Sequence, residues 1–170
     1  MIIGIDVDNT IVPSCDLWGE WMHKTHGLNM YNDNHYDNDY ASEKFLCWWK
    51  DKYLYDHMEP YEDAEKYINL LAKDHKIWFL TKCFDEHMQS KIRFCNKFFK
   101  YDRFFNTGFN KADAFDDVIH YMIDDRPSIL EGFSKAKCYR IKYTVEPQEL
   151  DVLYSWKEIY DDIRRCDGKF

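Results

Sequence analysis

The sequence lacks any long apolar run. No stretch approaches the roughly 20 consecutive apolar residues that a helix needs to cross a bilayer. The first ten residues, MIIGIDVDNT, carry neither a basic leader nor a cleavage site of small residues. We therefore expect no secretion signal and no membrane partner.

Closely spaced metal-binding or redox motifs are also missing. The chain has six cysteines, and the nearest two, Cys83 and Cys95, lie twelve residues apart, so there is no CxxC pair. We expect reduced thiols in a cytoplasmic protein. The seven histidines show no HExxH spacing. We expect them to be surface or cap residues, and nothing in the sequence requires His57 or His87 to reach a substrate.

An excess of basic charge is lacking as well. The formal net charge of −8 argues against binding to duplex nucleic acid, which needs many Lys and Arg side chains on phosphates. A small phosphorylated substrate stays compatible, because one metal ion and one or two lysines reverse the field locally. With 170 residues, 6 Gly and 4 Pro, the chain fits one domain without a flexible linker.

What the sequence does contain is an alternation of short apolar runs and helical patterns. Strands are predicted at Ile2–Asp6, Ile77–Leu80, Ile119–Ile123 and Cys138–Ile141, with a short one at Phe104–Phe105. Helices are predicted at Ala64–Ala72, Glu86–Phe99 and Tyr154–Arg165. This alternation predicts an α/β fold with an open, parallel, Rossmann-like sheet that helices flank on both faces.

One stretch interrupts the alternation. Two aromatic helical patterns, Asp16–Thr25 and Ser42–Tyr53, surround the polar segment Asn29–Tyr40. An insertion directly after the first strand lies over the carboxyl end of the sheet, where open α/β folds bind ligands. We therefore predict a small helical cap at residues 15–59 on a core formed by residues 1–14 and 60–170.

Two carboxylates follow the first predicted strand. Asp6 and Asp8 lie in the sequence DVDNT, which predicts two acidic groups side by side on a tight turn. One carboxylate can attack phosphorus, and the other can protonate the leaving oxygen and then deprotonate a water molecule. A purely structural interpretation, with Asp8 in a turn and Thr10 as a cap, is the alternative.

Two further predicted strands end in residues of the same chemistry. Asp124 and Asp125 follow the apolar run that ends at Ile123, and Thr81 closes the run KIWFLT. Mg²⁺ prefers a few carboxylates and retains several waters. The two acidic strand ends therefore predict a Mg²⁺ site, and the hydroxyl of Thr81 predicts a phosphate contact beside it.

A lysine is still needed to offset the charge of a phosphate near Asp6. Lys111 lies before Asp124, where a loop leads into a predicted helix, and Lys91 lies on the helix after Thr81. The spacing does not distinguish these two candidates.

These residues together resemble the haloacid dehalogenase superfamily of phosphatases. IGIDVDNTIV is similar to its first motif, WFLT to its second and IDD to its fourth. Within the superfamily the chain resembles the 5'(3')-deoxyribonucleotidases, through IDDRP, through the segment Lys91–Phe99 and through the segment Trp49–Pro60. The resemblance spans nearly the whole chain.

The resemblance implies specific roles. Asp6 is expected to be the nucleophile and Asp8 the general acid and base. Mg²⁺ is expected on Asp6 and on Asp125 of the pair Asp124–Asp125, with the backbone carbonyl of Asp8. Thr81 and Lys111 are expected to hold the phosphate, with Lys91 and Asn9 as further candidates, and Trp49 is expected to line a nucleoside pocket. Members of the family often have Gly where this chain has Asn9 and Ser where it has Lys82, which leaves base and sugar preference open.

The sequence thus predicts a Mg²⁺-dependent phosphatase, a monomer or a homodimer, that hydrolyses (deoxy)nucleoside monophosphates. A second hypothesis keeps the chemistry and changes the substrate to a sugar phosphate, another small metabolite or a phosphorylated nucleic-acid end. Two hypotheses come from different classes: a binding protein that kept the fold without activity, and a cap whose acidic, aromatic surface binds a protein. The intact set of carboxylates, threonine and lysine argues against an inactive binding protein.

Overall fold

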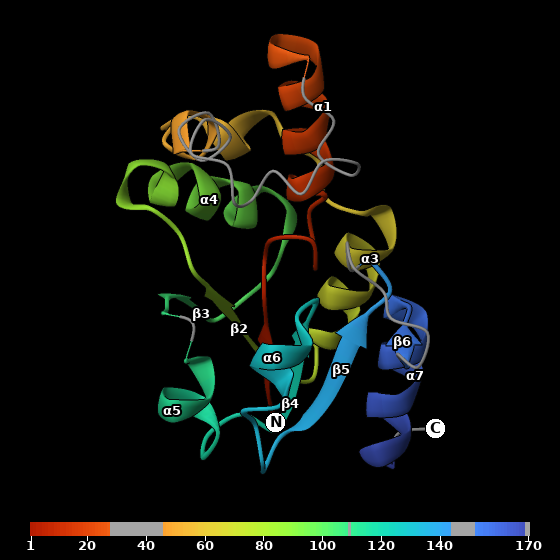
Figure 1. Ribbon diagram of the computed structural model, residues 1–170. Helices are drawn as coiled ribbons and strands as arrows, with labels where there is room; N and C mark the ends of the chain where they lie inside the picture. The colour runs from red at the N-terminus through yellow and green to blue at the C-terminus, as the bar shows by residue number, and fades with distance from the viewer. Residues whose placement is uncertain (28–45, 109, 144–151, 169–170) are drawn as a thin grey trace.

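The computed structural model describes residues 1–27, 46–108, 110–143 and 152–168. Its strands form one parallel sheet with the order β3-β2-β1-β4-β5-β6 (Figure 1). The strands are β1 Ile2–Ile5, β2 Lys76–Thr81, β3 Arg103–Asn106, β4 Tyr121–Asp124, β5 Lys137–Ile141 and β6 Leu153–Tyr154. This confirms the predicted α/β fold, and the strand order reverses between β1 and β4.

Helices connect the strands and cover both faces of the sheet (Figure 1). They are α1 Ser14–His26, the 3₁₀ helix η2 Leu54–His57, α3 Glu62–Leu71, α4 Asp85–Phe98, α5 Lys111–Phe115, α6 Pro127–Leu130 and α7 Trp156–Cys166. Residues from α3, α4 and α7 join one hydrophobic cluster, which contains Ile3 and Ile5 of β1. Residues from α5 and α6 join a second cluster, which contains Leu80 and Met122.

Successive residues of β1 face these two clusters in turn, as the period of a strand requires. Ile3 and Ile5 are fully buried in the first cluster, whereas Gly4 faces the second. A Cβ atom at Gly4 would lie 2.6 Å from Cδ1 of Ile119. The central strand therefore needs glycine here, because a side chain would displace its neighbours in the second cluster.

The end of the chain differs from the sequence-based prediction. Tyr154 was expected to begin a helix, but it pairs in β6 with β5, and α7 begins at Trp156. Ser155 forms a capping box with Glu158, in which each side chain binds the other residue's backbone N–H. This cap fixes the start of the helix and leaves Tyr154 outside it.

The helix predicted at Ser42–Tyr53 ends earlier than Tyr53 in the structure. Residues 46–49 are helical, and the chain then turns into η2. The carboxylate of Asp51 accepts a hydrogen bond of 2.8 Å from the backbone N–H of Tyr53, and such a local side-chain bond competes with helix continuation. The predicted polar segment Asn29–Tyr40 lies outside the described residues.

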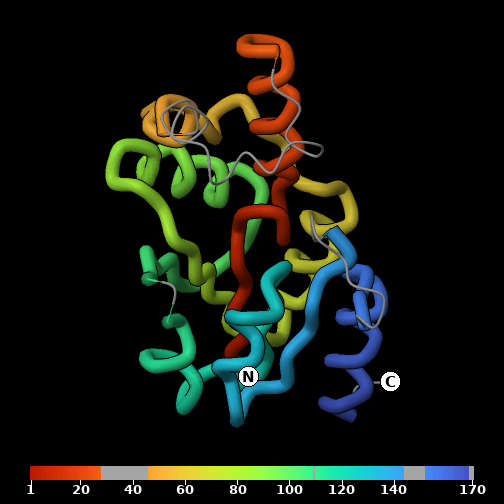
Figure 2. Tube along the Cα trace, viewed as in Figure 1, coloured from red at the N-terminus to blue at the C-terminus, as the bar shows by residue number. Residues whose placement is uncertain are grey.

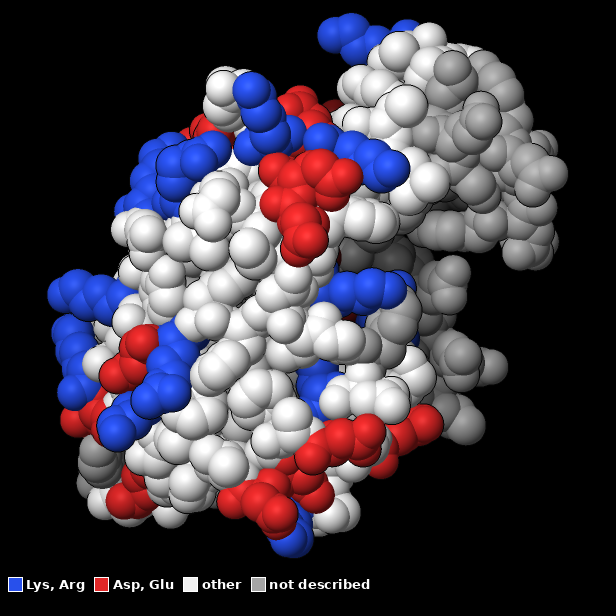
Figure 3. All heavy atoms as spheres, turned by 90° about the vertical axis from the view of Figure 1, so that its left-hand side faces the viewer, with Lys and Arg blue, Asp and Glu red and all other residues white. Residues whose placement is uncertain are grey.

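The N-terminus lies far from α1, the orange-red helix that stands beyond the carboxyl ends of the strands (Figure 1 and Figure 2). On the face that includes α4, basic and acidic side chains are interspersed (Figure 3). Ion pairs between Arg93 and Asp56 and between Lys97 and Glu59 join α4 to the chain around η2. All six cysteines are free thiols. Within the described ranges, no helix has the length and apolar character required to span a bilayer.

Candidate active site

Three carboxylates meet where the strand order reverses. Asp6 directly follows β1, and its backbone N–H donates to the carbonyl of Ile123 in β4 at 2.9 Å. Asp124 is the last residue of β4, and Asp125 follows it. Because β1 and β4 are parallel neighbours, their carboxyl ends lie at the same edge of the sheet. This edge is the position at which open α/β sheets bind ligands.

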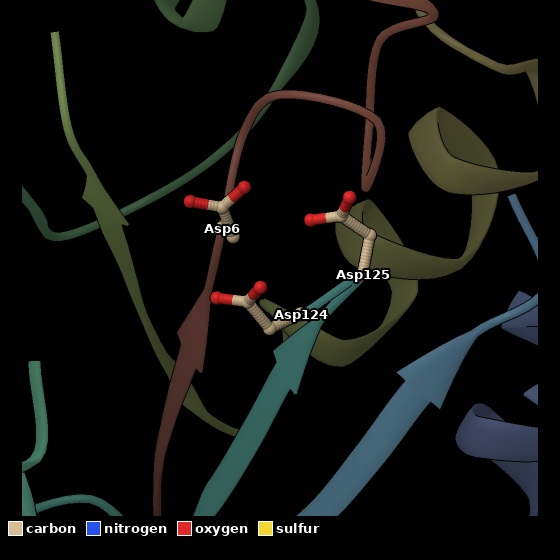
Figure 4. Close-up of side chains that lie close together, drawn as sticks. All are labelled: Asp6, Asp124 and Asp125. Atoms are coloured by element: carbon tan, nitrogen blue, oxygen red, sulfur yellow. The ribbon is translucent and has the colours of Figure 1, made fainter. Parts of the chain in front are cut away.

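The three carboxylates face one common space (Figure 4). One oxygen from each of Asp6, Asp124 and Asp125 lies within 4.8 Å of the others, and all three residues are buried. Burial and mutual repulsion raise the pKa of Asp6 above its usual range, although Lys111 opposes the shift. Burial and the charges of Asp6 and Asp124 raise the pKa of Asp125 in the same way. A cation would relieve this repulsion, and an all-oxygen set of this kind suits Mg²⁺.

Lys111, the first residue of α5, lies between two of the carboxylates. Its Nζ is 2.5 Å from Oδ1 of Asp6 and 2.7 Å from Oδ2 of Asp124, and the residue is only 4% exposed. Burial alone would lower the pKa of Lys111, but the charges of Asp6 and Asp124 raise it above its usual range. Lys111 is therefore a fixed buried cation beside Asp6.

Asp124 and Asp125 differ in their contacts. Asp124 is held on both oxygens, by Lys111 on Oδ2 and by the backbone N–H of Arg126 at 2.9 Å on Oδ1. Asp125 makes no side-chain hydrogen bond or ion pair to any residue in the described part of the chain. The carboxylate of Asp125 is therefore the more available of the two for a metal ion.

Two side chains donate hydrogen bonds to the carboxylate of Asp8. Its Oδ2 accepts from Nζ of Lys91 at 2.6 Å, and its Oδ1 accepts from the hydroxyl of Tyr55 at 2.5 Å. Burial alone would raise the pKa of Asp8, but the charge and hydrogen bond of Lys91 and the hydrogen bond of Tyr55 hold it below its usual range. A carboxyl group with a lowered pKa is ionised at neutral pH, so Asp8 is a carboxylate.

Asn9 shapes the turn that carries Asp6 and Asp8. Its φ of 55° lies in the left-handed region, which asparagine tolerates better than most residues. Its side-chain oxygen accepts from the backbone N–H of Cys15 at 2.9 Å, and its amide nitrogen donates to Sγ of Cys15 at 2.9 Å. The Asn9 side chain therefore anchors the turn to the start of α1.

A cavity of about 290 Å³ opens on these groups. Its polar wall contains Asp6, Asp8, Asn9, Lys111, Asp124 and Asp125. Its remaining lining includes Trp49, Phe84, His87, Cys15, Cys83 and Ile129. Charged oxygen ligands on one side and aromatic surface on the other suit a ligand with a phosphate and an organic group.

The predicted site residues divide into two groups. The first group lines the cavity and consists of Asp6, Asp8, Asn9, Trp49, Lys111, Asp124 and Asp125. Thr81 and Lys91 do not line it, and both are fully buried beneath Asp8. Nζ of Lys91 also donates to Oγ1 of Thr81 at 3.1 Å, so Thr81 helps to hold the ammonium group that binds Asp8.

Sequence reasoning missed two residues of this region. The phenol of Tyr55 was not singled out, because a tyrosine in an aromatic segment gives no signal of a distant carboxylate partner. The expectation that every histidine is a surface or cap residue was wrong for His87, which is 1% exposed on α4 and lines the cavity. It was also wrong for His75, which is buried and lies 3.0 Å from Asp167.

No protein-family model and no curated protein sequence matches this chain. Solved structures do match it. A haloacid dehalogenase-like family hydrolase from Streptococcus pneumoniae aligns with a TM-score of 0.65 and 12% identity, over 95% of this chain and 97% of that one. A haloacid dehalogenase-like family hydrolase from Xanthomonas campestris aligns with a TM-score of 0.58 and 13% identity, over 99% and 96% of the two chains.

A third match is a protein from Bacillus subtilis, described as a HAD-hydrolase and bound to magnesium. It aligns with a TM-score of 0.62 and 14% identity, over 95% of this chain and 97% of that one. At these identities the likeness concerns the fold: the chain has the fold of haloacid dehalogenase-like hydrolases over nearly its whole length.

Proposed function

We propose that this protein is a Mg²⁺-dependent phosphatase that hydrolyses (deoxy)nucleoside monophosphates through an aspartyl-phosphate on Asp6. The observation that carries the proposal is the cluster of Asp6, Asp124 and Asp125 at the reversal of the strand order, with Lys111 beside it. A nucleophilic carboxylate, an acid–base carboxylate and a hard-metal site then share one cavity.

The first step forms the intermediate. A carboxylate oxygen of Asp6 attacks phosphorus in line, the bond from phosphorus to the leaving oxygen breaks, and Asp8 gives its proton to that oxygen. The incoming phosphate brings negative charge beside Asp8, which raises its pKa and lets it carry the proton. Lys111 stabilises the negative charge on the phosphoryl oxygens.

The second step releases phosphate. Asp8, now a carboxylate, takes a proton from a water molecule, and the resulting hydroxide attacks phosphorus of the intermediate. Inorganic phosphate leaves and the carboxylate of Asp6 is restored. A Mg²⁺ ion held by Asp6 and Asp125 would supply positive charge that offsets the charge of the transferring group.

The aromatic lining supports a nucleoside as the organic part of the substrate. Trp49 is 7% exposed and lines the cavity with Phe84 and His87. An indole face at this position can stack on a base. A sugar phosphate or another small phosphomonoester is the second candidate substrate, because the proposed catalytic groups contact only the phosphate and the leaving oxygen.

The test is release of inorganic phosphate from a panel of substrates, with Mg²⁺ and with EDTA. The panel contains nucleoside and deoxynucleoside 5'- and 3'-monophosphates, sugar phosphates and an aryl phosphate, together with a 2-chloro acid as a dehalogenation substrate. We expect Mg²⁺-dependent release that favours nucleotides. Release from sugar phosphates alone would replace the substrate class, and chloride release without phosphate release would overturn the proposal.

A variant and its control test whether the activity depends on Asp6. Asp6→Asn removes the attacking carboxylate while keeping the size of the side chain, so we expect turnover to be lost and the melting temperature to be retained. Asp117→Asn is the matched control, because Asp117 lies at the surface with a side chain that is 79% exposed. A fully active Asp6→Asn protein would exclude the aspartyl-phosphate mechanism.

A further inference from the structure

Two fully enclosed residues hold the acid–base carboxylate without reaching the cavity. Tyr55 is 1% exposed and Lys91 is 0% exposed, yet both end on Asp8, whose side chain is 22% exposed. Tyr55 comes from η2, and Lys91 comes from α4. The carboxylate therefore has one partner from each of two elements that are distant in sequence.

Both partners are themselves fixed. The backbone N–H of Tyr55 donates to Oγ of Ser90 at 3.4 Å, and its ring packs against His87 with centroids 5.4 Å apart. Nζ of Lys91 lies 4.7 Å from the centre of the Tyr55 ring and donates to Oγ1 of Thr81. The positions of the phenol and the ammonium group are therefore set before any ligand enters.

The contacts with Tyr55 and Lys91 leave the carboxylate of Asp8 able to contact a substrate. The hydrogen bonds from Lys91 and Tyr55 take one lone pair on each oxygen, and a carboxylate has about four such sites. Asp8 accordingly still lines the cavity. Stability alone is a weak reason for the arrangement, because a buried ion pair gains little over apolar residues of the same volume.

We infer that Tyr55 and Lys91 are positioning residues that aim the carboxylate of Asp8 at the leaving oxygen of the substrate. The inference rests on the proposed phosphatase reaction and adds a specific expectation to it. The two residues matter most when the leaving oxygen needs a proton, as a sugar hydroxyl does. They matter little in the first step when the leaving group is stable as an anion, as an aryl oxide is.

The arrangement also connects proton transfer to substrate recognition. Tyr55 follows Trp49 by six residues, and the ring of His87 contacts both, with centroid distances of 5.9 Å to Trp49 and 5.4 Å to Tyr55. Nδ1 of His87 donates to the carbonyl of Trp49. Trp49, which would contact the organic group of the substrate, and Tyr55, which positions Asp8, thus pack together through His87.

The test compares two substrates in Tyr55→Phe. The quantity measured is kcat/KM, which covers binding and the first irreversible step, here the departure of the leaving group. We expect kcat/KM for a deoxynucleoside monophosphate to fall at least about tenfold, the effect of losing a hydrogen bond to a charged group. We expect kcat/KM for p-nitrophenyl phosphate to stay within about twofold.

The matched control is Tyr139→Phe. Tyr139 is also 1% exposed, and its hydroxyl also donates to an aspartate, Asp162, at 2.7 Å, but it lies in β5 away from the cavity. We expect this variant to leave the ratio of the two kcat/KM values unchanged. Melting temperatures of both variants report any loss of folded protein.

A double variant shows whether Tyr55 acts through Asp8. In an Asp8→Asn background, Tyr55→Phe is expected to cause no further change in the ratio. Lys91→Met is a second single variant, with the same expected selectivity. Equal losses on both substrates, or no loss, in Tyr55→Phe would overturn the inference and leave the phosphatase proposal standing. A wild-type protein inactive on both substrates would remove the phosphatase proposal and this inference with it.

Discussion

Nζ of Lys111 lies 2.5 Å from Oδ1 of Asp6, a residue 105 positions earlier in the chain. The same ammonium group contacts Asp124, so one buried cation faces two of the three clustered carboxylates. The proposed nucleophile therefore depends on Lys111 for its charge balance, in addition to the phosphate contact that we propose for Lys111.

Replacement of Lys111 by methionine removes this cation. We expect Lys111→Met to lower the free energy of unfolding of the metal-free protein by about 3–5 kcal/mol, because it leaves buried carboxylates without a partner. We also expect kcat/KM to fall at least about 100-fold. Denaturant unfolding and steady-state kinetics measure the two effects. Lys135→Met is the control, because its exposed ion pair with Asp117 is screened by solvent and contributes little to stability. Similar stability losses in both variants would contradict the assignment.

The stability of the metal-free protein depends on the carboxylate cluster. The folded-state pKa values of Asp6 and Asp125 are raised above the unfolded value of 3.8. The folded protein then binds more protons than the unfolded chain, so stability falls as pH rises above about 4 towards neutral. Chemical unfolding in EDTA at several pH values measures this slope. We expect Asp125→Asn to flatten it, and an equally steep slope in that variant would refute the explanation.

Mg²⁺ is expected to reverse this loss at neutral pH. At a concentration about 100 times its dissociation constant, a bound ion stabilises the folded state by about 2.7 kcal/mol. For a chain of this size the melting temperature rises by roughly 5–10 °C. Asp125→Asn is expected to abolish the rise, whereas Asp117→Asn at the surface keeps it. Thermal melting with and without EDTA makes the comparison, and an undiminished rise in Asp125→Asn would place the ion elsewhere.

Trp49 is expected to recognise the organic part of the substrate. Loss of a stacking indole costs about 1–3 kcal/mol per base, so Trp49→Ala should lower kcat/KM for nucleotides by roughly 5- to 150-fold. Hydrolysis of glycerol phosphate, which has no base, should change little. Trp48→Ala is the control, because Trp48 packs edge-on against Trp49 at 4.8 Å and does not line the cavity. Equal effects of Trp48→Ala and Trp49→Ala would indicate a packing role only.

The sequence by itself determined five of the six strands, all except β6, and most of the polar wall. Short apolar runs that end in Asp6 and in Asp124–Asp125 predicted strands with carboxylates at their ends, and parallel pairing of β1 with β4 brings those ends together. This part was predictable because a buried parallel strand has a strong local signal, and its carboxyl end has a fixed place in the fold.

The tertiary structure alone decided which lysine lies where. The sequence offered both Lys91 and Lys111 as candidates, yet α4 buries Lys91 against Asp8, while α5 starts at the cavity and presents Lys111 to Asp6. It also decided the partnership of Tyr55 with Asp8, which are separated by 47 residues. Such contacts depend on how η2 and α4 pack against the strand ends. Local sequence fixes each helix, but only the packed core fixes the distance between side chains on different elements.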